Sequence, residues 1–238
     1  PSCSISFQNI TMMHYTRSVP ATLMIAASLA VASAANIPIE SFSDPVHTWN
    51  TMNDPVMGGE SSSSLSLDRE HGTLIFSGEV AIVPYLGVPG FILAYADDGP
   101  FPDVSSCAGL RLRIAAEEEY KGYRLSFGYR HLPGGGHAYG YKADFDAPVG
   151  VWGDVFVPFE NFTASWDEAS GDPIVTCGEN PDFCPDEETL RDMRTISIWG
   201  EGVAGNETLY IESIGGTRCD ESDKNQDLES TIMSAAAD

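Results

Sequence analysis

Apolar and polar residues alternate along most of the chain, the pattern of β-strands that bury one face. The clearest case is Leu110, Leu112 and Ile114, which alternate with two arginines. The segments with this pattern, bounded by Gly, Pro or polar turn residues, are 62–67, 73–83, 91–96, 110–114, 123–129, 139–145, 151–159, 195–199 and 209–214. About nine or ten short strands without intervening helices predict an all-β fold, a β-sandwich or jelly roll.

Two local signals add detail to this pattern. The Gly-rich segment 131–136 (HLPGGG) has the length of a hairpin connection, so the strands on either side of it are expected to pair antiparallel. Residues 164–188 form a long acidic, Pro-containing loop in which Asp186 is placed to cap a short helix over 187–193.

The first 34 residues have the pattern of a secretory signal segment. Arg17 is followed by the apolar stretch 21–32, and Ala32, Ser33 and Ala34 match a small-x-small cleavage site. We therefore expect a domain over 35–219 and an acidic, disordered tail over 220–238. The leader predicts the secretory pathway, the extracellular space or an endomembrane compartment. A mitochondrial leader, or a plastid route that begins with such a signal, is the alternative.

Composition narrows the possible partners. The 238 residues are 42% hydrophobic, enough for a core, and 12 Lys plus Arg against 35 Asp plus Glu give a formal net charge of -23. A field of this sign repels nucleic-acid phosphates and anionic lipids. We expect no nucleic-acid partner and, because no later segment is long and apolar enough, no transmembrane helix in the mature chain.

Four cysteines remain after the leader. Their even number predicts two disulfides, with Cys177–Cys184 and Cys107–Cys219 favoured among three connectivities, and four buried free thiols as the alternative. In the same compartment Asn161 and Asn206, each within an Asn-x-Thr sequon, would be glycosylation sites, making the protein a glycoprotein.

No motif of a known catalytic site stands out. The chain has no GxSxG nucleophile elbow, and its one GxGxxG sequence, at 200–205, precedes another strand rather than the helix that binding a dinucleotide requires. We therefore expect no catalytic residues, no enzymatic activity and no cofactor.

The segment around Asp54 is the most distinctive one in the chain. Asn53 and Asp54 can hydrogen-bond to their own backbone, and Pro55 and two glycines shape tight turns. The interpretation is a structural loop. A weak alternative is a structural Ca²⁺ ion bound through Asp54, although one carboxylate falls far short of the ligands such an ion needs.

The same segment resembles the signature of the NADH:ubiquinone oxidoreductase complex I intermediate-associated protein 30 family, a Trp followed by NDxVMGGxS. The matching residues here are Trp49, Asn53, Asp54, Met57, Gly58, Gly59 and Ser61. Further similarity lies at 76–80, 89–91, 107–113, 151–152, 157–159 and 211–214. The resemblance implies a galactose-binding-domain-like jelly roll and a non-enzymatic assembly factor or chaperone, for respiratory complex I or for photosynthetic complexes. These motif residues then form a structural or ligand-binding loop.

Two kinds of partner follow. An assembly factor binds proteins, and subunits of membrane complexes are the partners that this role implies. The alternative is a secreted or endomembrane module that binds carbohydrate or another ligand, because aromatic rings in jelly rolls can stack on sugars. Trp166, in the acidic loop, is the candidate surface aromatic, whereas Trp152 and Trp199 lie in expected strands and are assigned to the core.

Overall fold

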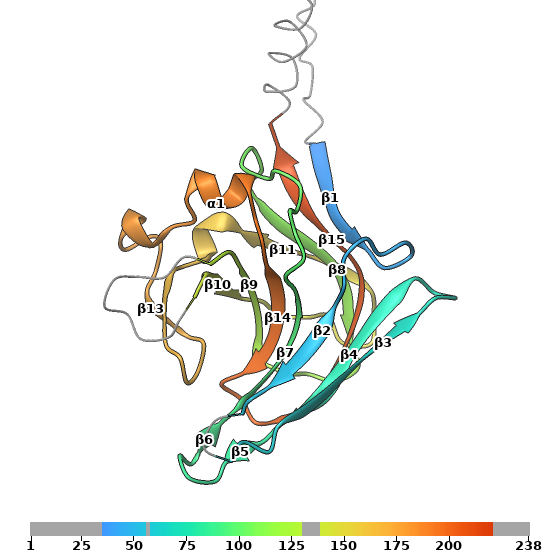
Figure 1. Ribbon diagram of the computed structural model, residues 1–238, viewed down its shortest axis with the longest axis vertical. Coiled ribbons are helices and arrows are strands. Elements are labelled where there is room, and N and C mark those ends of the chain that lie inside the picture. Colours follow the sequence, from blue (N-terminus) through green and yellow to red (C-terminus); the bar gives the residue numbers. More distant parts are fainter. Residues whose placement is uncertain (1–34, 56–57, 130–138, 221–238) are drawn as a thin grey trace, which may run out of the picture. The chain divides into compact units, whose positions relative to one another are not determined.

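The computed structural model describes residues 35–55, 58–129 and 139–220. The predicted signal segment (1–34), the tail from residue 221 and Met57 of the motif lie outside these residues. Within them, two β-sheets enclose one hydrophobic core, which confirms the β-sandwich (Figure 1).

The larger sheet has six strands in the order β11-β8-β15-β4-β3, with β1 paired to β15 as well. These strands are β1 (Ala35–Ser41), β3 (Ser62–Asp68), β4 (Thr73–Val80), β8 (Gly109–Ala116), β11 (Gly153–Pro158) and β15 (Gly205–Cys219). The register of β15 shifts between Ile211 and Ser213, and its two halves pair with β4 and β1 in turn. A bulge of this kind lets one long strand bend and serve two neighbours.

The smaller sheet has five strands in the order β10-β9-β14-β7-β2. They are β2 (Asn50–Asn53), β7 (Phe91–Ala96), β9 (Tyr123–Phe127), β10 (Tyr141–Asp144) and β14 (Ile196–Glu201). All of its pairings are antiparallel, including the predicted pairing of β9 with β10. Its inner face supplies aromatic side chains to the core, among them the fully buried Tyr123, Phe127 and Tyr141.

The remaining elements lie in the connections between these strands. They are β5 (Ile82–Val83), β6 (Val88–Pro89), the 3-10 helices η1 (Phe159–Asn161) and η2 (Pro181–Phe183), β12 (Ser165–Trp166), β13 (Pro173–Val175) and α1 (Glu187–Arg191). Asp186 caps α1 as predicted, its side chain accepting a hydrogen bond from the Thr189 amide at 2.7 Å. The helix is shorter than the sequence suggested because the backbone leaves the helical conformation at Asp192.

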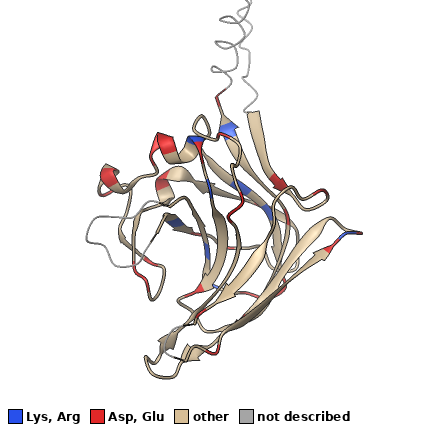
Figure 2. Cartoon of the chain, in the orientation of Figure 1, with Lys and Arg blue, Asp and Glu red and all other residues tan. Residues whose placement is uncertain are grey.

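Two disulfides join the cysteines in the favoured pattern, Cys107–Cys219 and Cys177–Cys184. The first ties the segment before β8 to the end of β15, and the second closes the loop between β13 and α1. Figure 2 shows Asp and Glu spread over the loops and α1, while the few Lys and Arg lie mainly on strands.

Candidate functional site

The outer face of the five-stranded sheet carries polar and aromatic side chains instead of a plain solvated surface. Residues directly opposite each other in the register share a face, so Trp199 lies between Arg124 and Leu93, and Ser126 lies between Lys142 and Ser197. Several of these polar residues are buried although they point away from the core. Something therefore covers this face.

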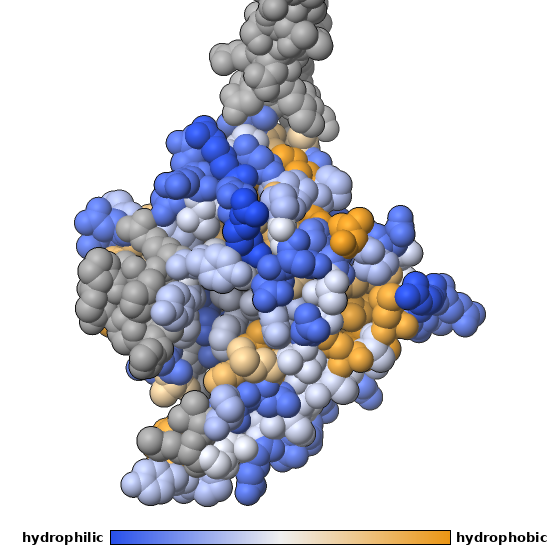
Figure 3. All heavy atoms as spheres, viewed as in Figure 1, coloured by the Kyte–Doolittle hydropathy of each residue, from blue (hydrophilic) through white to orange (hydrophobic). Residues whose placement is uncertain are grey.

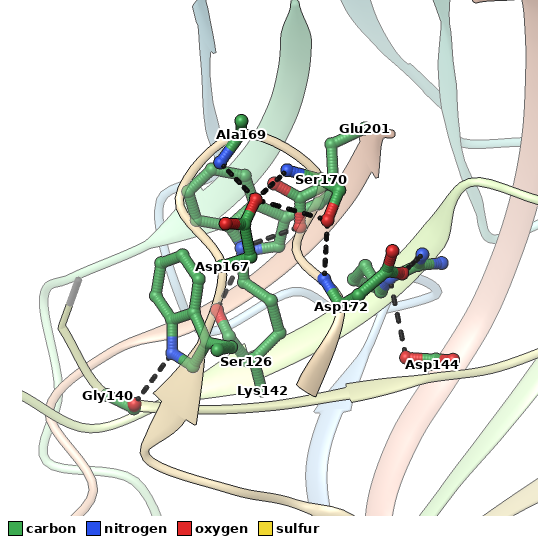
Figure 4. A network of polar contacts seen from close by, with 12 residues as sticks. Ser126, Gly140, Lys142, Asp144, Asp167, Ala169, Ser170, Asp172 and Glu201 are labelled. Carbon is green, nitrogen blue, oxygen red and sulfur yellow. Dashed lines mark hydrogen bonds and ion pairs between the residues drawn. The ribbon is translucent and has the colours of Figure 1, made fainter. Parts of the chain in front are cut away.

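The cover is the segment that holds β12 and β13, here called the flap (residues 164–176). Its turn is held by Asp167, whose carboxylate accepts hydrogen bonds from the amides of Ala169 and Ser170 at 2.9 Å each. Figure 4 shows this turn lying over Glu201. Gly171 has a positive φ of 76°, and any Cβ there would collide with the Glu201 carboxylate. Only glycine lets the flap approach so closely.

A buried ion pair lies beneath the flap. Lys142 Nζ is 2.6 Å from Glu201 Oε1, and both side chains are almost completely inaccessible to solvent. The same ammonium is 3.6 Å from the ring centroid of Trp166 and 3.8 Å from that of Trp199. Burial lowers the pKa of Lys142 and raises the pKa of Glu201, and the attraction between the two charges opposes both shifts.

Hydrogen bonds from the indoles fix this arrangement. Trp199 Nε1 donates to Ser126 Oγ at 2.7 Å, and Trp166 Nε1 donates to the Gly140 carbonyl at 3.2 Å. Both rings therefore have a polar anchor at one end and a cation against their faces.

Arg124 extends the network to the edge of the flap. Its guanidinium is 2.8 Å from Asp172 and 3.4 Å from Asp144, which are both labelled in Figure 4. It also donates to the Lys121 and Tyr123 carbonyls. Asp172 belongs to the flap and Asp144 to β10, so the buried Arg124 links the flap to the smaller sheet.

An open cleft of about 550 Å³ lies beside this closed network. Apolar and aromatic residues dominate its lining, which consists of Asp54, Val83, Leu86, Val88, Pro89, Gly90, Phe91, Trp166, Glu168, Ala169, Trp199 and Glu201. One wall is the β5–β6 hairpin, where Ile82, Tyr85, Leu86 and Val88 are exposed and Tyr85 is 81% accessible. The volume of the cleft is typical of ligand-binding pockets.

The motif segment forms the end of this cleft. The Asp54 amide donates to the Phe91 carbonyl at 2.9 Å, which fastens the segment to β7. A Cβ on Gly90 would lie 2.8 Å from Asp54 Oδ2, and one on Gly59 would lie 2.5 Å from the Asp54 carbonyl oxygen. Both glycines are thus required by close packing around Asp54.

Other motif residues have structural contacts. Ser61 Oγ accepts a hydrogen bond from the Ala81 amide, and Asn53 Oδ1 accepts one from Ser63 Oγ at 2.6 Å. Trp49 Nε1 donates to the buried carboxylate of Glu40, which also accepts hydrogen bonds from the Val46 and His47 amides. Gly58 has a positive φ of 80° in the turn.

Trp49 lies apart from the cleft, beside a smaller hollow of about 240 Å³. That hollow lies between Pro45, Leu65 and Leu67, among other residues, and Figure 3 shows a hydrophobic patch between β2 and the β3–β4 hairpin. The structure therefore brings Asp54, but not Trp49, to the cleft.

The tryptophan predictions were wrong. Trp166 is only 8% exposed, because it lies under the flap turn against Lys142 and is not a free surface aromatic. Trp152 is 41% exposed and precedes β11, and Trp199 is half-buried on the outer face, so neither belongs to the core. Strand alternation cannot tell which sheet face a cover will bury.

The other predicted sites are placed as follows. Asn161, in η1, and Asn206, near the start of β15, both have exposed side chains. Over the ranges that the structure describes, no group of three or more His, Cys, Asp or Glu is arranged to hold a metal ion, and Asp54 has no such set around it. No helix in those ranges is long and apolar enough to cross a membrane.

The sequence analysis missed Lys142, Glu201 and Arg124. One signal was available for Lys142 and Arg124, because each is a charged residue flanked by apolar neighbours inside a short strand. Such a position usually faces solvent, and only the flap makes it a buried one.

Comparison with known proteins gives a family and a fold. The sequence profile of Complex I intermediate-associated protein 30 matches residues 40–173. The search of curated protein sequences returns no significant match.

Among solved structures, similar ones include the family 11 carbohydrate-binding module from Clostridium thermocellum in complex with a β-1,3-1,4-mixed-linked tetrasaccharide. The likeness has 15% identity and a TM-score of 0.50, covering 77% of this chain and 96% of that one. The family 11 module of the cellulosomal cellulase Lic26A-Cel5E from the same organism has 14% identity and a TM-score of 0.50, covering 78% and 95%. At this identity the likeness shows the shared jelly-roll fold.

Proposed function

The chain belongs to the complex I intermediate-associated protein 30 family, and from that premise we propose that it is a non-catalytic module that binds a protein partner during assembly of a larger complex. The observation that carries this proposal is the apolar cleft beside the exposed β5–β6 hairpin. Exposed apolar side chains beside a concave surface are typical of protein interaction sites.

The rest of the outer face supports a rigid frame for binding. The Lys142–Glu201 pair is closed off by the flap, and Arg124 joins the flap to the sheet. Paired, hydrogen-bonded charges of this kind hold one conformation, so the cleft wall formed by Trp166 and Trp199 is already in place before a partner binds.

Carbohydrate binding is the second candidate, supported by the fold shared with carbohydrate-binding modules. The geometry favours it less. Sugar stacking needs an open aromatic face, yet Trp166 and Trp199 both have Lys142 against a ring face, and Trp166 is almost fully buried.

The disulfides support an oxidising compartment, consistent with the secretory leader expected from the sequence. We accordingly propose the secretory pathway or an endomembrane compartment as its location. Imaging of a C-terminally tagged chain, together with intact mass before and after deglycosylation, tests this placement. Residence in mitochondria with reduced thiols would overturn it.

The function is tested by site-specific photo-crosslinking in the protein's own cells. A photoreactive residue at Leu86, on the cleft wall, should give a discrete crosslinked protein. One at Val151, an apolar residue before β11 that is also exposed, should not. The crosslinked protein is then purified and its affinity measured. Leu86→Asp with Val88→Asp should weaken binding by about tenfold or more, and Val151→Asp should leave it unchanged.

Two results would count against the proposal. Equal crosslinking from Leu86 and Val151 would mean that the cleft is not the binding site. Tight binding of a mixed-linkage β-glucan tetrasaccharide, lost in the Leu86/Val88 variant, would replace protein binding with the carbohydrate alternative.

A further inference from the structure

A second open hollow, of about 450 Å³, lies between the flap and the edge of the smaller sheet. Its lining comes from three places along the chain: the end of β10, the 3-10 helix η1, and the return limb of the flap with the loop after it. The lining residues, all of them exposed, are Asp144, Glu160, Asn161, Pro173, Thr176 and Gly178. Only the proline is a bulky apolar residue, so this hollow suits a hydrated ligand better than an apolar one.

One of these lining residues, Asn161, is the acceptor of a glycosylation sequon that continues with Phe162 and Thr163. The Asn161 side chain is exposed, whereas Phe162 is fully buried and Thr163 is 1% exposed. Thr163 Oγ1 also donates a hydrogen bond to the Val175 carbonyl of β13 at 2.6 Å. These two buried residues fix the backbone after Asn161, so a sugar attached to its side chain starts at the rim of the hollow.

The opposite wall of the hollow is a limb of the flap with one free edge. In the described part of the chain β13 pairs with β12 alone, so its other edge has no strand beside it. Pro173 and Thr176, at the two ends of this limb, line the hollow together with Asn161. A group that starts at Asn161 and fills the hollow therefore contacts both η1 and the flap.

We propose that Asn161 carries an N-linked glycan whose first N-acetylglucosamine lies in this hollow, with its apolar ring face on Pro173, and stabilises the closed position of the flap. The inference rests on the secretory location proposed above and is independent of the protein-binding cleft. In the attachment step Asn161 Nδ2 loses a proton and bonds to C1 of the sugar. The bond from C1 to the pyrophosphate oxygen of a lipid-linked oligosaccharide donor breaks, and the lipid pyrophosphate leaves with that electron pair.

The second sequon of the domain offers a matched comparison. Asn206 is also exposed, but it lies opposite Glu79 on the larger sheet and does not line the hollow. A glycan on Asn206 has the same chemistry and bulk without the contact to Pro173. Only the Asn161 glycan should therefore change the opening of the flap.

Glycopeptide mass spectrometry tests the modification itself. The full-length tagged chain and its Asn161→Gln and Asn206→Gln variants are purified from the protein's own cells. The peptide that contains Asn161 should carry a glycan that begins with N-acetylglucosamine, and Asn161→Gln should remove it. An exported protein with an unmodified Asn161 would overturn the inference.

Hydrogen–deuterium exchange tests where the glycan lies. Amides of the flap (164–176) should exchange at least about threefold faster in Asn161→Gln than in the parent, and at the parent rate in Asn206→Gln. An endoglycosidase that leaves one N-acetylglucosamine on the parent should keep the slow exchange, because the first sugar makes the contact. This trimmed parent carries no substitution, so its result does not depend on how a variant folds.

Three exchange results would overturn the placement of the glycan. Equal flap exchange in the parent and in Asn161→Gln would show that the glycan does not contact the flap. Faster exchange in both glutamine variants would show a general effect of glycans, and faster exchange after trimming would assign the contact to outer sugars. None of these results bears on the cleft, because crosslinking from Leu86 tests the protein-binding function separately.

Discussion

Glu201 and Glu207 lie on consecutive strands, and their side chains meet opposite kinds of surroundings. Glu201, on the outer face of the smaller sheet, is 2% exposed and has Lys142 2.6 Å away under two tryptophans. Glu207, on β15, is 1% exposed, and neither carboxylate oxygen has a hydrogen-bond partner of standard geometry among the described residues. Its polar neighbour is the Tyr123 hydroxyl.

The two surroundings show how the protein stabilises each buried carboxyl group. Glu201 is paired with a cation because Lys142 lies on the same outer face of the smaller sheet. The flap covers both side chains. Among the described residues no cation contributes to the pKa of Glu207. Burial, with a smaller contribution from the negative charge of Glu118, raises this pKa to about 8, so Glu207 holds a proton at neutral pH. The stability of the fold around Glu201 therefore depends on the presence of Lys142, whereas the stability around Glu207 depends on pH.

Removing the partner of Glu201 should have the largest effect. Lys142→Met leaves a buried carboxylate without its cation, and we expect a loss of about 3–5 kcal/mol in the free energy of unfolding. Urea denaturation at pH 7 measures it. The double variant Lys142→Met/Glu201→Leu should recover most of the loss, because both charges are then gone. A single variant as stable as the parent would show that the pair is not closed off.

Glu207→Gln should remove the contribution of Glu207 to the pH dependence of the free energy of unfolding. The pKa of Glu207 rises from 4.5 to about 8 on folding, so the folded state binds the proton more tightly. The contribution of Glu207 to the free energy of unfolding is then fully present below about pH 4.5 and is lost as pH rises toward 8, by on the order of 3 kcal/mol or more. The glutamine variant should melt several degrees higher than the parent at pH 8 and similarly at pH 4.5.

The control for that experiment is Glu212→Gln, on the same strand but exposed and paired with Arg113. Its melting profile should follow the parent at every pH. Parallel pH profiles for the parent and Glu207→Gln would contradict the assignment of a protonated acid.

Removing the Cys177–Cys184 disulfide should make the flap over Glu201 more mobile and leave the surroundings of Glu207 unchanged. Replacing both cysteines with serine frees a short loop and should cost about 2.5 kcal/mol by the loop-entropy relation. Hydrogen–deuterium exchange should speed up in the flap (164–176) while β15 amides exchange as before. Faster exchange throughout β15 as well would mean that the bridge stabilises the whole sandwich.

The smallest effect is expected at the rim of the network. Asp172→Asn removes one partner of Arg124 but leaves Asp144 in place, and Asp172 itself is exposed, so we expect a loss of about 1 kcal/mol or less. Adding Asp144→Asn should cost more than the sum of the single changes, because the buried guanidinium then has no carboxylate. Strict additivity in thermal denaturation would argue against a shared role of the two aspartates.

Local signals predicted a large part of the fold. Alternation identified β3, β4, β7, β8, β9, β10, β11, β14 and β15, and Asp186 marked the start of α1. The strands β1 and β2 were missed, since β1 contains a proline and β2 is four polar or mixed residues long. Their strand state comes from pairing with β15 and β7 rather than from propensity.

The candidate site was predictable only in part. The motif identified Asp54, which does line the cleft, and Gly59, which packs against Asp54, but not the cleft itself. The position of Trp166 could not be derived, because it depends on the turn at Gly171 and on where the flap comes to rest.

The amino-acid sequence by itself determined the all-β class, most strands, the disulfide pairing favoured from spacing, and the family. These follow from side-chain periodicity, cysteine number and short motifs, which are properties of neighbouring residues. Only the tertiary structure decided that Lys142 meets Glu201 against the rings of two tryptophans, that Arg124 meets Asp144 and Asp172, and that the described surroundings of Glu207 supply no cation. Such pairs join different strands, so their distances depend on register, sheet packing and the closure of the flap, which no local pattern specifies.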